Sequence, residues 1–250
     1  MKNKVVVIDW GIAIHRAGYA NVPNSSPAYL CMSMILSNLK LIKLNKNDIV
    51  IVAVDGGRSW RKDYEQEYKA NRKKQREKSG KDWTQLYKDF DRLLEQIDIS
   101  TNWHIVNIKG LEADDIMAVA SRYYNDREVV LVTYDSDLEQ MWAYDNVKIF
   151  SPHPKSKKYK IPPKNFNVYK LIGSKIKKEA SDNLTSPVIT DQDYQKRKIC
   201  VNLLQLPEWV EGLVVDKLDN IKEKENKLHL FPYPKLIDRF EKIYYDSRLF

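Results

Sequence analysis

Residues 110–120 read GLEADDIMAVA, in which Glu112, Asp114 and Asp115 stand directly before an apolar run of helical character. Acidic residues are common in the first turn of a helix, where they meet the positive end of the helix dipole. Carboxylates are also the ligands that hard cations such as Mg²⁺ prefer. This stretch alone leaves both interpretations open, so the positions of the other acids must decide between them.

Further acids follow stretches that have the composition of buried strands, namely VVVI (5–8), IVIVAV (49–54) and VVLVTY (129–134). The carboxyl ends of parallel strands meet at one edge of a sheet, where ligands bind. The sequence therefore predicts that seven carboxylates converge there: Asp9, Asp55, Glu112, Asp114, Asp115, Asp135 and Asp137. Aspartate is also a common turn residue, which is the alternative explanation at any single position.

Such a cluster of like charges needs cations. Each pair of carboxylates 4 Å apart repels by about 4 kcal/mol near a protein surface. The absence of cysteine or histidine beside these acids favours hard ions such as Mg²⁺ or Mn²⁺. Two such ions next to a polyanion indicate phosphodiester hydrolysis, because the pair stabilises both the attacking and the leaving oxygen.

The net charge of +8 and the pI near 9.2 indicate a polyanionic partner. Residues 58–81 hold ten Lys/Arg against four Asp/Glu, which is +6 of that +8, and they directly follow Asp55-Gly56-Gly57. Trp60, Tyr64 and Tyr68 alternate with these cations, as expected of a segment that stacks bases and neutralises phosphates. A solvated charged helix is the alternative.

The elements that must position these residues alternate along the chain. Strands are expected within 4–10, 48–57, 104–110, 128–137 and 146–152, and helices at 28–42, 83–97 and 112–124. This order predicts an α/β domain over residues 1–165, with a mainly parallel sheet flanked by helices. Residues 152–166 read as a loop, and 166–250 as a smaller helical region in which 234–250 forms a packed helix.

The two cysteines, Cys31 and Cys200, lie far apart and show no CxxC spacing, which argues against a disulfide framework and a zinc site. The run VVVI is interrupted by Asp9, so it is too short for a signal peptide, and no stretch reaches membrane-spanning length. We therefore expect a soluble protein of the cytoplasm without a membrane partner.

Six stretches in order, VVVID, VDGG, EYKANR, GLEADD, TYDSD and EASDN, resemble the motif series of the structure-specific 5′ nucleases. This family comprises flap endonucleases, the 5′ nuclease domains of bacterial DNA polymerases and phage 5′-3′ exonucleases. The likeness is greatest to the ribonucleases H of T-even bacteriophages and runs from Lys4 to about Asn183. It implies a PIN-like fold with a helical arch at about 58–81, under or through which a 5′ single strand passes.

By that resemblance, the acids would hold two Mg²⁺ or Mn²⁺ ions. The first ion would be bound by Asp9, Asp55, Glu112 and Asp114, and the second by Asp115, Asp135 and Asp137 with the late pair Glu179 and Asp182. The family usually has Asp-x-x-Asp-Asn preceded by glycine at the late motif. Here Glu179 takes the place of the first aspartate and is one methylene longer.

The resemblance also assigns the cations. Lys69 and Arg72 would contact the phosphate that is cut, and the surrounding nucleic-acid contacts would come from Arg58, Arg61, Lys62, Tyr68, Arg72, Lys73, Lys74 and Arg76. Downstream, the family usually has a glycine-rich helix-hairpin-helix that binds K⁺. Residues 183–198 contain no glycine, which puts the K⁺ site in doubt and leaves Lys196, Arg197 and Lys198 as substitute phosphate contacts.

The implied activity is a divalent-metal-dependent 5′-3′ exonuclease or flap endonuclease that acts on DNA with a 5′ flap and on RNA–DNA duplexes, in primer removal or repair. A monomer is expected, with the C-terminal helix as a docking site for a replication protein such as a single-stranded-DNA-binding protein. A PIN-type ribonuclease and a non-catalytic nucleic-acid-binding protein are the alternatives. The basic segment argues against the first and the complete set of carboxylates against the second.

Overall fold

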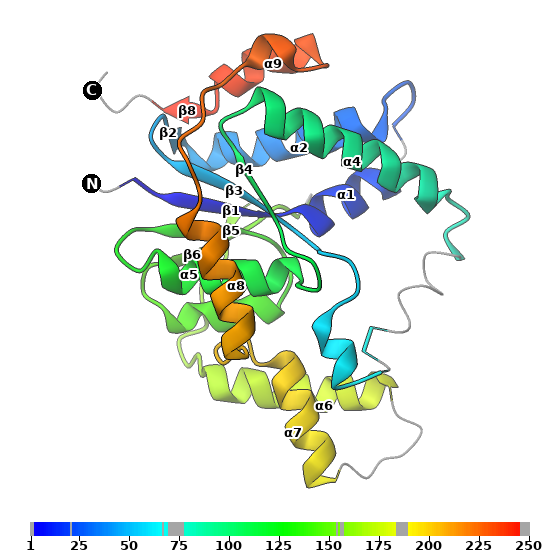
Figure 1. Ribbon diagram of the computed structural model, residues 1–250, viewed down its shortest axis with the longest axis vertical. Helices are drawn as coiled ribbons and strands as arrows, with labels where there is room; N and C mark the ends of the chain where they lie inside the picture. Colours follow the sequence, from blue (N-terminus) through cyan, green and yellow to red (C-terminus); the bar gives the residue numbers. More distant parts are fainter. Residues whose placement is uncertain are drawn as a thin grey trace.

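The computed structural model describes residues 3–20, 22–66, 68, 69, 78–153, 155, 158–183 and 190–245, and gives the backbone alone at 178–183 and 245. At its centre lies a six-stranded sheet with the order β4-β3-β1-β5-β6-β7 (Figure 1). The strands are β1 (Val5–Asp9), β3 (Ile49–Val54), β4 (His104–Asn107), β5 (Val129–Val132), β6 (Val147–Ser151) and β7 (Lys158–Tyr159). All neighbours pair parallel except β6 with β7, which confirms the predicted mainly parallel sheet.

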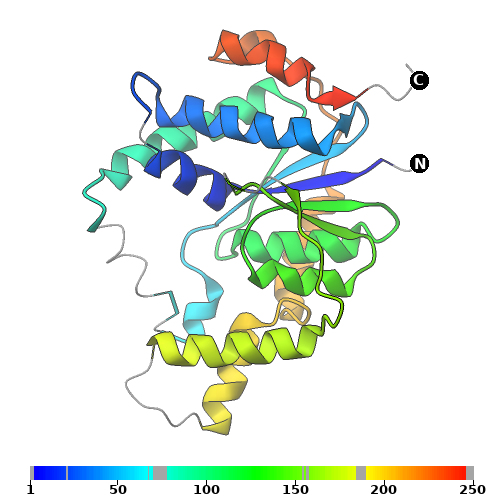
Figure 2. The same cartoon turned by 180° about the vertical axis from the view of Figure 1, so that it is seen from behind.

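Helices cover both faces of the sheet (Figures 1 and 2). They are α1 (Trp10–Tyr19), α2 (Pro27–Ile42), α4 (Trp83–Ser100), α5 (Ala113–Tyr123), α6 (Val168–Asn183), α7 (Asp191–Val201), α8 (Glu208–Asp219) and α9 (Pro234–Glu241). Short 3₁₀ helices are η1 (Trp60–Asp63), η2 (Asp137–Ala143) and η3 (Leu228–Leu230). Helix η1 lies in the predicted arch segment, 58–81, of which residues 67 and 70–77 lie outside the described chain.

Two apolar cores follow from the alternation of side chains along the strands. In β1, Val6 and Ile8 face the core shared with α1, α2, α4 and α9, whereas Val5 and Val7 face the core shared with α5 and α8. A strand that is buried on both faces must be apolar at every position, which explains the uninterrupted β-branched run. The α/β fold thus depends on the same residues that made the strand recognisable in the sequence.

The C-terminal helices are distributed over three places. Helix α8 packs in the core with α5, α9 packs in the core with α2, and α6 and α7 share a small apolar cluster of their own. Figure 1 shows α6 and α7 below the sheet, next to η1. The division at residues 165 and 166 stays a prediction.

The prediction of a helix over 234–250 is wrong at residues 242–245, because α9 ends at Glu241. Tyr244–Tyr245 forms strand β8, which pairs parallel with β2 (Leu44–Asn45), and residues 246–250 lie outside the described chain. Separately, none of the helices in the described ranges has both the length and the apolar composition needed to cross a bilayer.

Candidate metal-binding active site

The predicted ligands stand where the parallel strands end. Asp9 is the last residue of β1, Asp55 directly follows β3, and Asp135 lies between β5 and η2. Glu112 is the residue before α5, and Asp114 lies in the first turn of that helix. All of these acids therefore lie at the carboxyl edge of one sheet, as the strand pattern predicted.

Backbone hydrogen bonds of Gly56 and Gly110 hold the segment after β3, which carries Asp55, against the segment before α5, which carries Glu112. The Gly56 amide donates to the Leu111 carbonyl at 2.8 Å, and the Gly110 amide donates to the Gly56 carbonyl at 2.9 Å. A Cβ at Gly56 would lie only 1.8 Å from the Ile108 carbonyl oxygen, so no other residue fits without moving the backbone. The approach lets Asp55 Oδ1 accept the Ala113 amide at 2.8 Å, which fixes Asp55 against the start of α5.

Asp9 is held on both oxygens at the junction of β1 and α1. Its Oδ1 accepts the Ile12 amide at 3.0 Å, and its Oδ2 accepts the Thr133 hydroxyl at 3.2 Å. Burial raises the pKa of Asp9 to about 7, and the neighbouring carboxylates of Asp55 and Asp135 add to the rise. The charged form of Asp9 is therefore costly unless a cation accompanies it.

The charged form of Asp114 is also unfavourable. Burial raises its pKa well above the ordinary value, and although Lys69 opposes the rise, Asp135, Asp9 and Glu112 add to it. Among the described residues, none of the four carboxylates Asp9, Asp55, Asp114 and Asp135 forms an ion pair with a side chain. The acids thus raise one another's pKa values, and within the described chain none of these four carboxylates is neutralised by a direct ion pair.

This donor set fits a hard divalent cation. It consists of carboxylate oxygens, and the mutual repulsion it contains is what a bound cation would relieve. The described ranges contain no group of three or more Asp, Glu, His or Cys side chains arranged as a metal-binding site. The fit therefore rests on the chemistry of the donors and on their mutual repulsion.

Glu112 differs from Asp9, Asp55, Asp114 and Asp135 because it forms ion pairs with two cations. Lys69 Nζ lies 2.7 Å from Glu112 Oε1, and Arg61 Nη1 lies 2.9 Å from Glu112 Oε2. Burial opposes ionisation of this carboxyl, but Lys69 and Arg61 outweigh burial, so the pKa of Glu112 is lowered. Lys69 itself adopts the left-handed backbone conformation (φ 55°), which costs a non-glycine residue about 1–2 kcal/mol.

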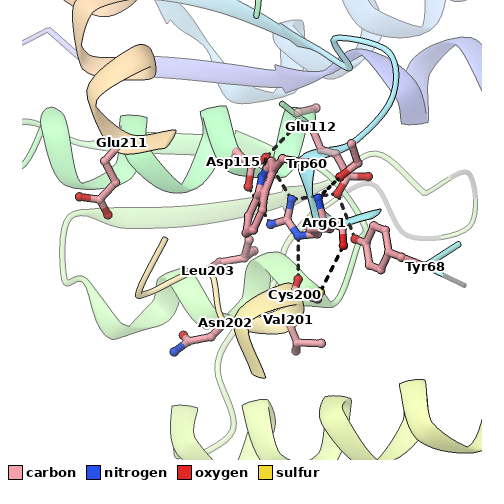
Figure 3. A network of polar contacts seen from close by, with 12 residues as sticks. Trp60, Arg61, Tyr68, Glu112, Asp115, Cys200, Val201, Asn202, Leu203 and Glu211 are labelled. Carbon is pink, nitrogen blue, oxygen red and sulfur yellow. Dashed lines mark hydrogen bonds and ion pairs between the residues drawn. The ribbon is translucent and has the colours of Figure 1, made fainter. Parts of the chain in front are cut away.

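A buried network joins η1 to the start of α5 (Figure 3). Arg61 binds Asp115 with two parallel hydrogen bonds, Nη2 to Oδ1 at 2.7 Å and Nη1 to Oδ2 at 3.0 Å. Asp115 Oδ2 also accepts Trp60 Nε1 at 3.1 Å and the Glu112 amide at 2.9 Å. Both partners are almost fully enclosed, with Asp115 at 0% and Arg61 at 1% exposure.

The structure places four residues where they do not fit their predicted roles. Asp115 was expected to bind a metal, but its oxygens are enclosed and occupied by the donors of Arg61, Trp60 and Glu112. Arg61 was expected to contact nucleic acid, but it is buried. Tyr68 was expected to stack on a base, but its ring is 7% exposed and its hydroxyl donates to Glu112 Oε2 at 3.0 Å. Arg197 was expected to contact phosphate, but it is 5% exposed.

The second group of predicted ligands lies at η2. Asp135 Oδ1 accepts the Asp137 amide at 2.9 Å, and Asp137 Oδ1 lies 2.6 Å from Lys175 Nζ of α6. Helix α6 continues through residues 179 and 182, so its backbone runs on from this contact. The side chains of Glu179 and Asp182 lie outside the described part of the chain.

The remaining predicted cations are spread over the surface. Arg58 is exposed, and its Nη1 lies 2.7 Å from Asp63 Oδ1. Lys196 is also exposed, whereas Lys62 and Lys198 are half-buried. Residues 72, 73, 74 and 76, predicted as arch cations, lie outside the described chain. The structure therefore describes predicted cations on the segment after β3 and on α7.

Two residues near the acids were missed by sequence reasoning. The Thr133 hydroxyl accepts the Asp135 amide at 3.0 Å and donates to Asp9, so it joins two ligand positions. Gly11 leaves open the space beside Asp9 and Asp55, because a Cβ there would lie 3.4 Å from Asp9 Oδ1. Their closeness in sequence to Asp135 and Asp9 was the signal that could have pointed to them.

Two known proteins are similar to this chain in sequence. Ribonuclease H of Enterobacteria phage T4 is 26% identical over 196 residues, which are 74% of this chain and 63% of that protein. A 5′-3′ exonuclease of Mycoplasmopsis pulmonis is 27% identical over 143 residues, 55% of this chain and 45% of the relative. The chain thus matches less than two thirds of the length of either relative.

Solved structures show the same fold. A T5 5′-exonuclease with bound zinc ions superimposes with a TM-score of 0.55 at 16% identity, covering 88% of this chain and 100% of the other. A phage T5 flap endonuclease in complex with DNA and metal ions gives 0.56 at 16% identity, covering 96% and 99%. Residues 4–170 match the family described as "5′-3′ exonuclease, N-terminal resolvase-like domain". The chain therefore belongs to the 5′-3′ exonuclease family.

Proposed function

We propose that this protein is a divalent-metal-dependent 5′ nuclease that hydrolyses phosphodiesters at the 5′ ends of DNA flaps and of RNA in RNA–DNA duplexes. The observation that carries the proposal is the group formed by Asp9, Asp55, Asp114 and Asp135 at the carboxyl edge, none of which forms an ion pair with a described side chain. Family membership supports the reaction class.

Asp9, Asp55, Asp114 and Glu112 would hold the first Mg²⁺ or Mn²⁺ ion, and Asp135 and Asp137 the second, with Glu179 and Asp182 as further candidates. Bound ions would supply the Lewis acidity that activates water and stabilises charge on the phosphate. The protein's own contribution is to fix the carboxylates through the Ile12, Thr133 and Ala113 donors. A K⁺ site has no support in this arrangement.

Lys69 is the candidate for stabilising charge on the phosphate in the transition state, together with Arg72. Its ammonium group is 2.7 Å from Glu112 and its side chain is 20% exposed, so it lies between the acidic edge and solvent. A cation in this position acts on charge that develops during the reaction. Arg58, Lys62, Lys196 and Lys198 would neutralise backbone phosphates farther from the reacting atoms.

The biological setting that fits this activity is removal of replication primers or repair. The substrates would be DNA with a 5′ single-stranded flap and RNA–DNA duplex, met in the cytoplasm, and the protein would act as a monomer. A replication protein such as a single-stranded-DNA-binding protein is the proposed partner.

The test is cleavage of a 5′-labelled flap duplex and a 5′-labelled RNA-primed duplex in Mg²⁺, Mn²⁺ or EDTA. We expect short 5′ products with either metal and none in EDTA. Asp9→Asn should abolish cleavage, while Asp145→Asn, which makes the same change at an exposed position, should leave it unchanged. Binding of the flap without cleavage in any metal would refute the proposal and favour a binding protein on this scaffold.

A further inference from the structure

The corner between α7 and α8, residues 200–203, is held by side chains from the matched domain (Figure 3). Arg61 Nε donates to the Cys200 carbonyl at 2.7 Å, and Gln140 Nε2 donates to the Val201 carbonyl at 2.9 Å. Arg122 Nη1 donates to the Leu203 carbonyl at 3.0 Å. Carbonyls at the end of a helix lack partners within the helix, so these side chains satisfy groups that would otherwise be unpaired.

Arg61 connects this corner directly to the start of α5. The same guanidinium that binds the Cys200 carbonyl binds Glu112 and both oxygens of Asp115, and the Cys200 thiol lies 3.8 Å from the Arg61 carbonyl. Trp60 completes the contact, with its ring 4.6 Å from the Arg61 guanidinium and edge-to-face with Trp209 of α8. The planar guanidinium fixes the relative orientation of all its partners.

Gln140 provides a second connection, to the other group of acids. Its side chain is 0% exposed, and its Oε1 accepts the Leu203 amide at 3.0 Å while its Nε2 binds Val201. Gln140 belongs to η2, which begins at Asp137 and follows Asp135. The end of α7 is therefore bonded to η2 through Gln140 and connected through Arg61 to the start of α5, and both segments carry candidate metal ligands.

A duplex bound at α7 would contact the lysines near the end of this helix. Lys196 is exposed and Lys198 is half-buried, one turn before the corner. Because an α-helix is rigid over such a distance, a displacement of these lysines moves the Cys200 carbonyl, and with it Arg61.

We propose that Arg61 is a positioning residue that couples duplex binding by α7 to the placement of the metal ligands at the start of α5. This inference rests on the proposed function, because it assigns the duplex to α7 and the metal to Glu112 and Asp114. Coupling between two sites is reciprocal, so duplex must raise metal affinity by the same factor by which metal raises duplex affinity. The predicted factor for the unchanged protein is about 5 or more.

The experiment measures binding rather than cleavage. Mn²⁺ is titrated by electron paramagnetic resonance with and without a DNA duplex closed by a hairpin loop at each end, which offers no 5′ end to cut. Arg61→Lys keeps the charge but loses the fork that joins Asp115, Glu112 and Cys200. We expect its coupling factor to fall below about 2, while its duplex affinity in EDTA stays near that of the unchanged protein.

Arg122→Lys is the matched control. Arg122 binds the same corner through Leu203, but from the last turn of α5, at the far end from Glu112 and Asp114. Its variant should keep the coupling factor. A second comparison, Lys196→Ala with Lys198→Ala, should weaken duplex binding and leave Mn²⁺ affinity without duplex unchanged.

Three results would overturn the proposal: no coupling in the unchanged protein, a coupling factor retained by Arg61→Lys, or an equal loss in Arg122→Lys. If Arg61→Lys does not fold, hydrogen exchange in the unchanged protein takes its place. Duplex without metal should then slow exchange of the amides of residues 112–116 but not of 104–107 in β4, and protection confined to α7 would overturn the inference. A failure to cleave any substrate would refute the proposed function and leave these binding results interpretable.

Discussion

Replacing Gly11 with alanine should stabilise the protein and weaken its metal site. Gly11 is the second residue of α1, and a Cβ there would lie 3.4 Å from Asp9 Oδ1 and 3.9 Å from Asp55 Oδ2. Both are ordinary van der Waals distances, so the methyl group fits. Alanine is favoured over glycine in helices by up to about 1 kcal/mol, and we expect the free energy of unfolding in EDTA to rise by no more than that.

Metal binding should change in the opposite direction. The methyl group would lie within 4 Å of one oxygen of each carboxylate, and we expect it to crowd a cation bound to both, since Mg²⁺ lies only about 2.1 Å from its oxygen ligands. Changes next to metal ligands typically lower affinity about 10- to 100-fold. We therefore expect Mn²⁺ affinity to fall by about 10-fold or more.

Urea unfolding in EDTA and calorimetric titration with Mn²⁺ measure the two effects separately. Gly212→Ala is the control, because Gly212 lies inside α8, is exposed, and would have no atom within 4 Å of a new Cβ. It should gain similar stability and bind Mn²⁺ like the unchanged protein. Undiminished Mn²⁺ affinity in a folded Gly11→Ala protein would refute the inference that Asp9 and Asp55 share a cation on this side.

Asp135→Asn should abolish cleavage and leave flap binding measurable by fluorescence anisotropy; normal turnover would remove Asp135 from the site. Lys69→Ala should slow single-turnover cleavage by about 100-fold or more if its charge acts in the transition state, and an unchanged rate would exclude that role. Burial lowers the pKa of His104, with Lys224 adding to the effect, so the unfolded chain binds the proton more readily. Stability from this group is then complete above the unfolded pKa of about 6.5 and declines as pH falls through the folded value. Urea midpoints near pH 7.5 and 5.5 should therefore differ less in His104→Gln, and an equal difference in both proteins would contradict this prediction.

The positions of the acids could be predicted because they depend on a simple pattern. Strands buried on both faces are apolar at every position, so the first acid after such a run marks the strand end, as Asp9 and Asp55 do. Parallel pairing then places the ends at one edge. The pairing of β2 with β8 could not be predicted in this way, because each strand is two residues long and its partner lies about two hundred positions away.

The sequence of the basic segment could not predict which of its cations are buried and which are exposed. Arg61 and Lys62 are adjacent and of the same charge, yet Arg61 is buried and Lys62 is half-exposed. Arg61 is buried because its guanidinium has partners inside the protein, Asp115 and the Cys200 carbonyl, which lie 54 and 139 positions away in the sequence. Composition contains no information on such partners, so the segment's net charge overstated the number of cations available to a nucleic acid.

The Arg61–Asp115 pair is more readily explained by positioning than by stability. Enclosing two charges costs several kcal/mol per ion, and replacing such pairs by apolar residues of similar size is often neutral or stabilising by about 1–4 kcal/mol. An apolar contact would hold η1, α5 and α7 together without fixing their orientation, whereas the guanidinium fork binds Asp115, Glu112 and the Cys200 carbonyl in one plane. This network lies where the family match, which ends at residue 170, meets the helices beyond it. The enclosed charge therefore stands between α5, the proposed ligand helix, and α7, the proposed duplex-binding helix, where a fixed relative orientation would serve catalysis.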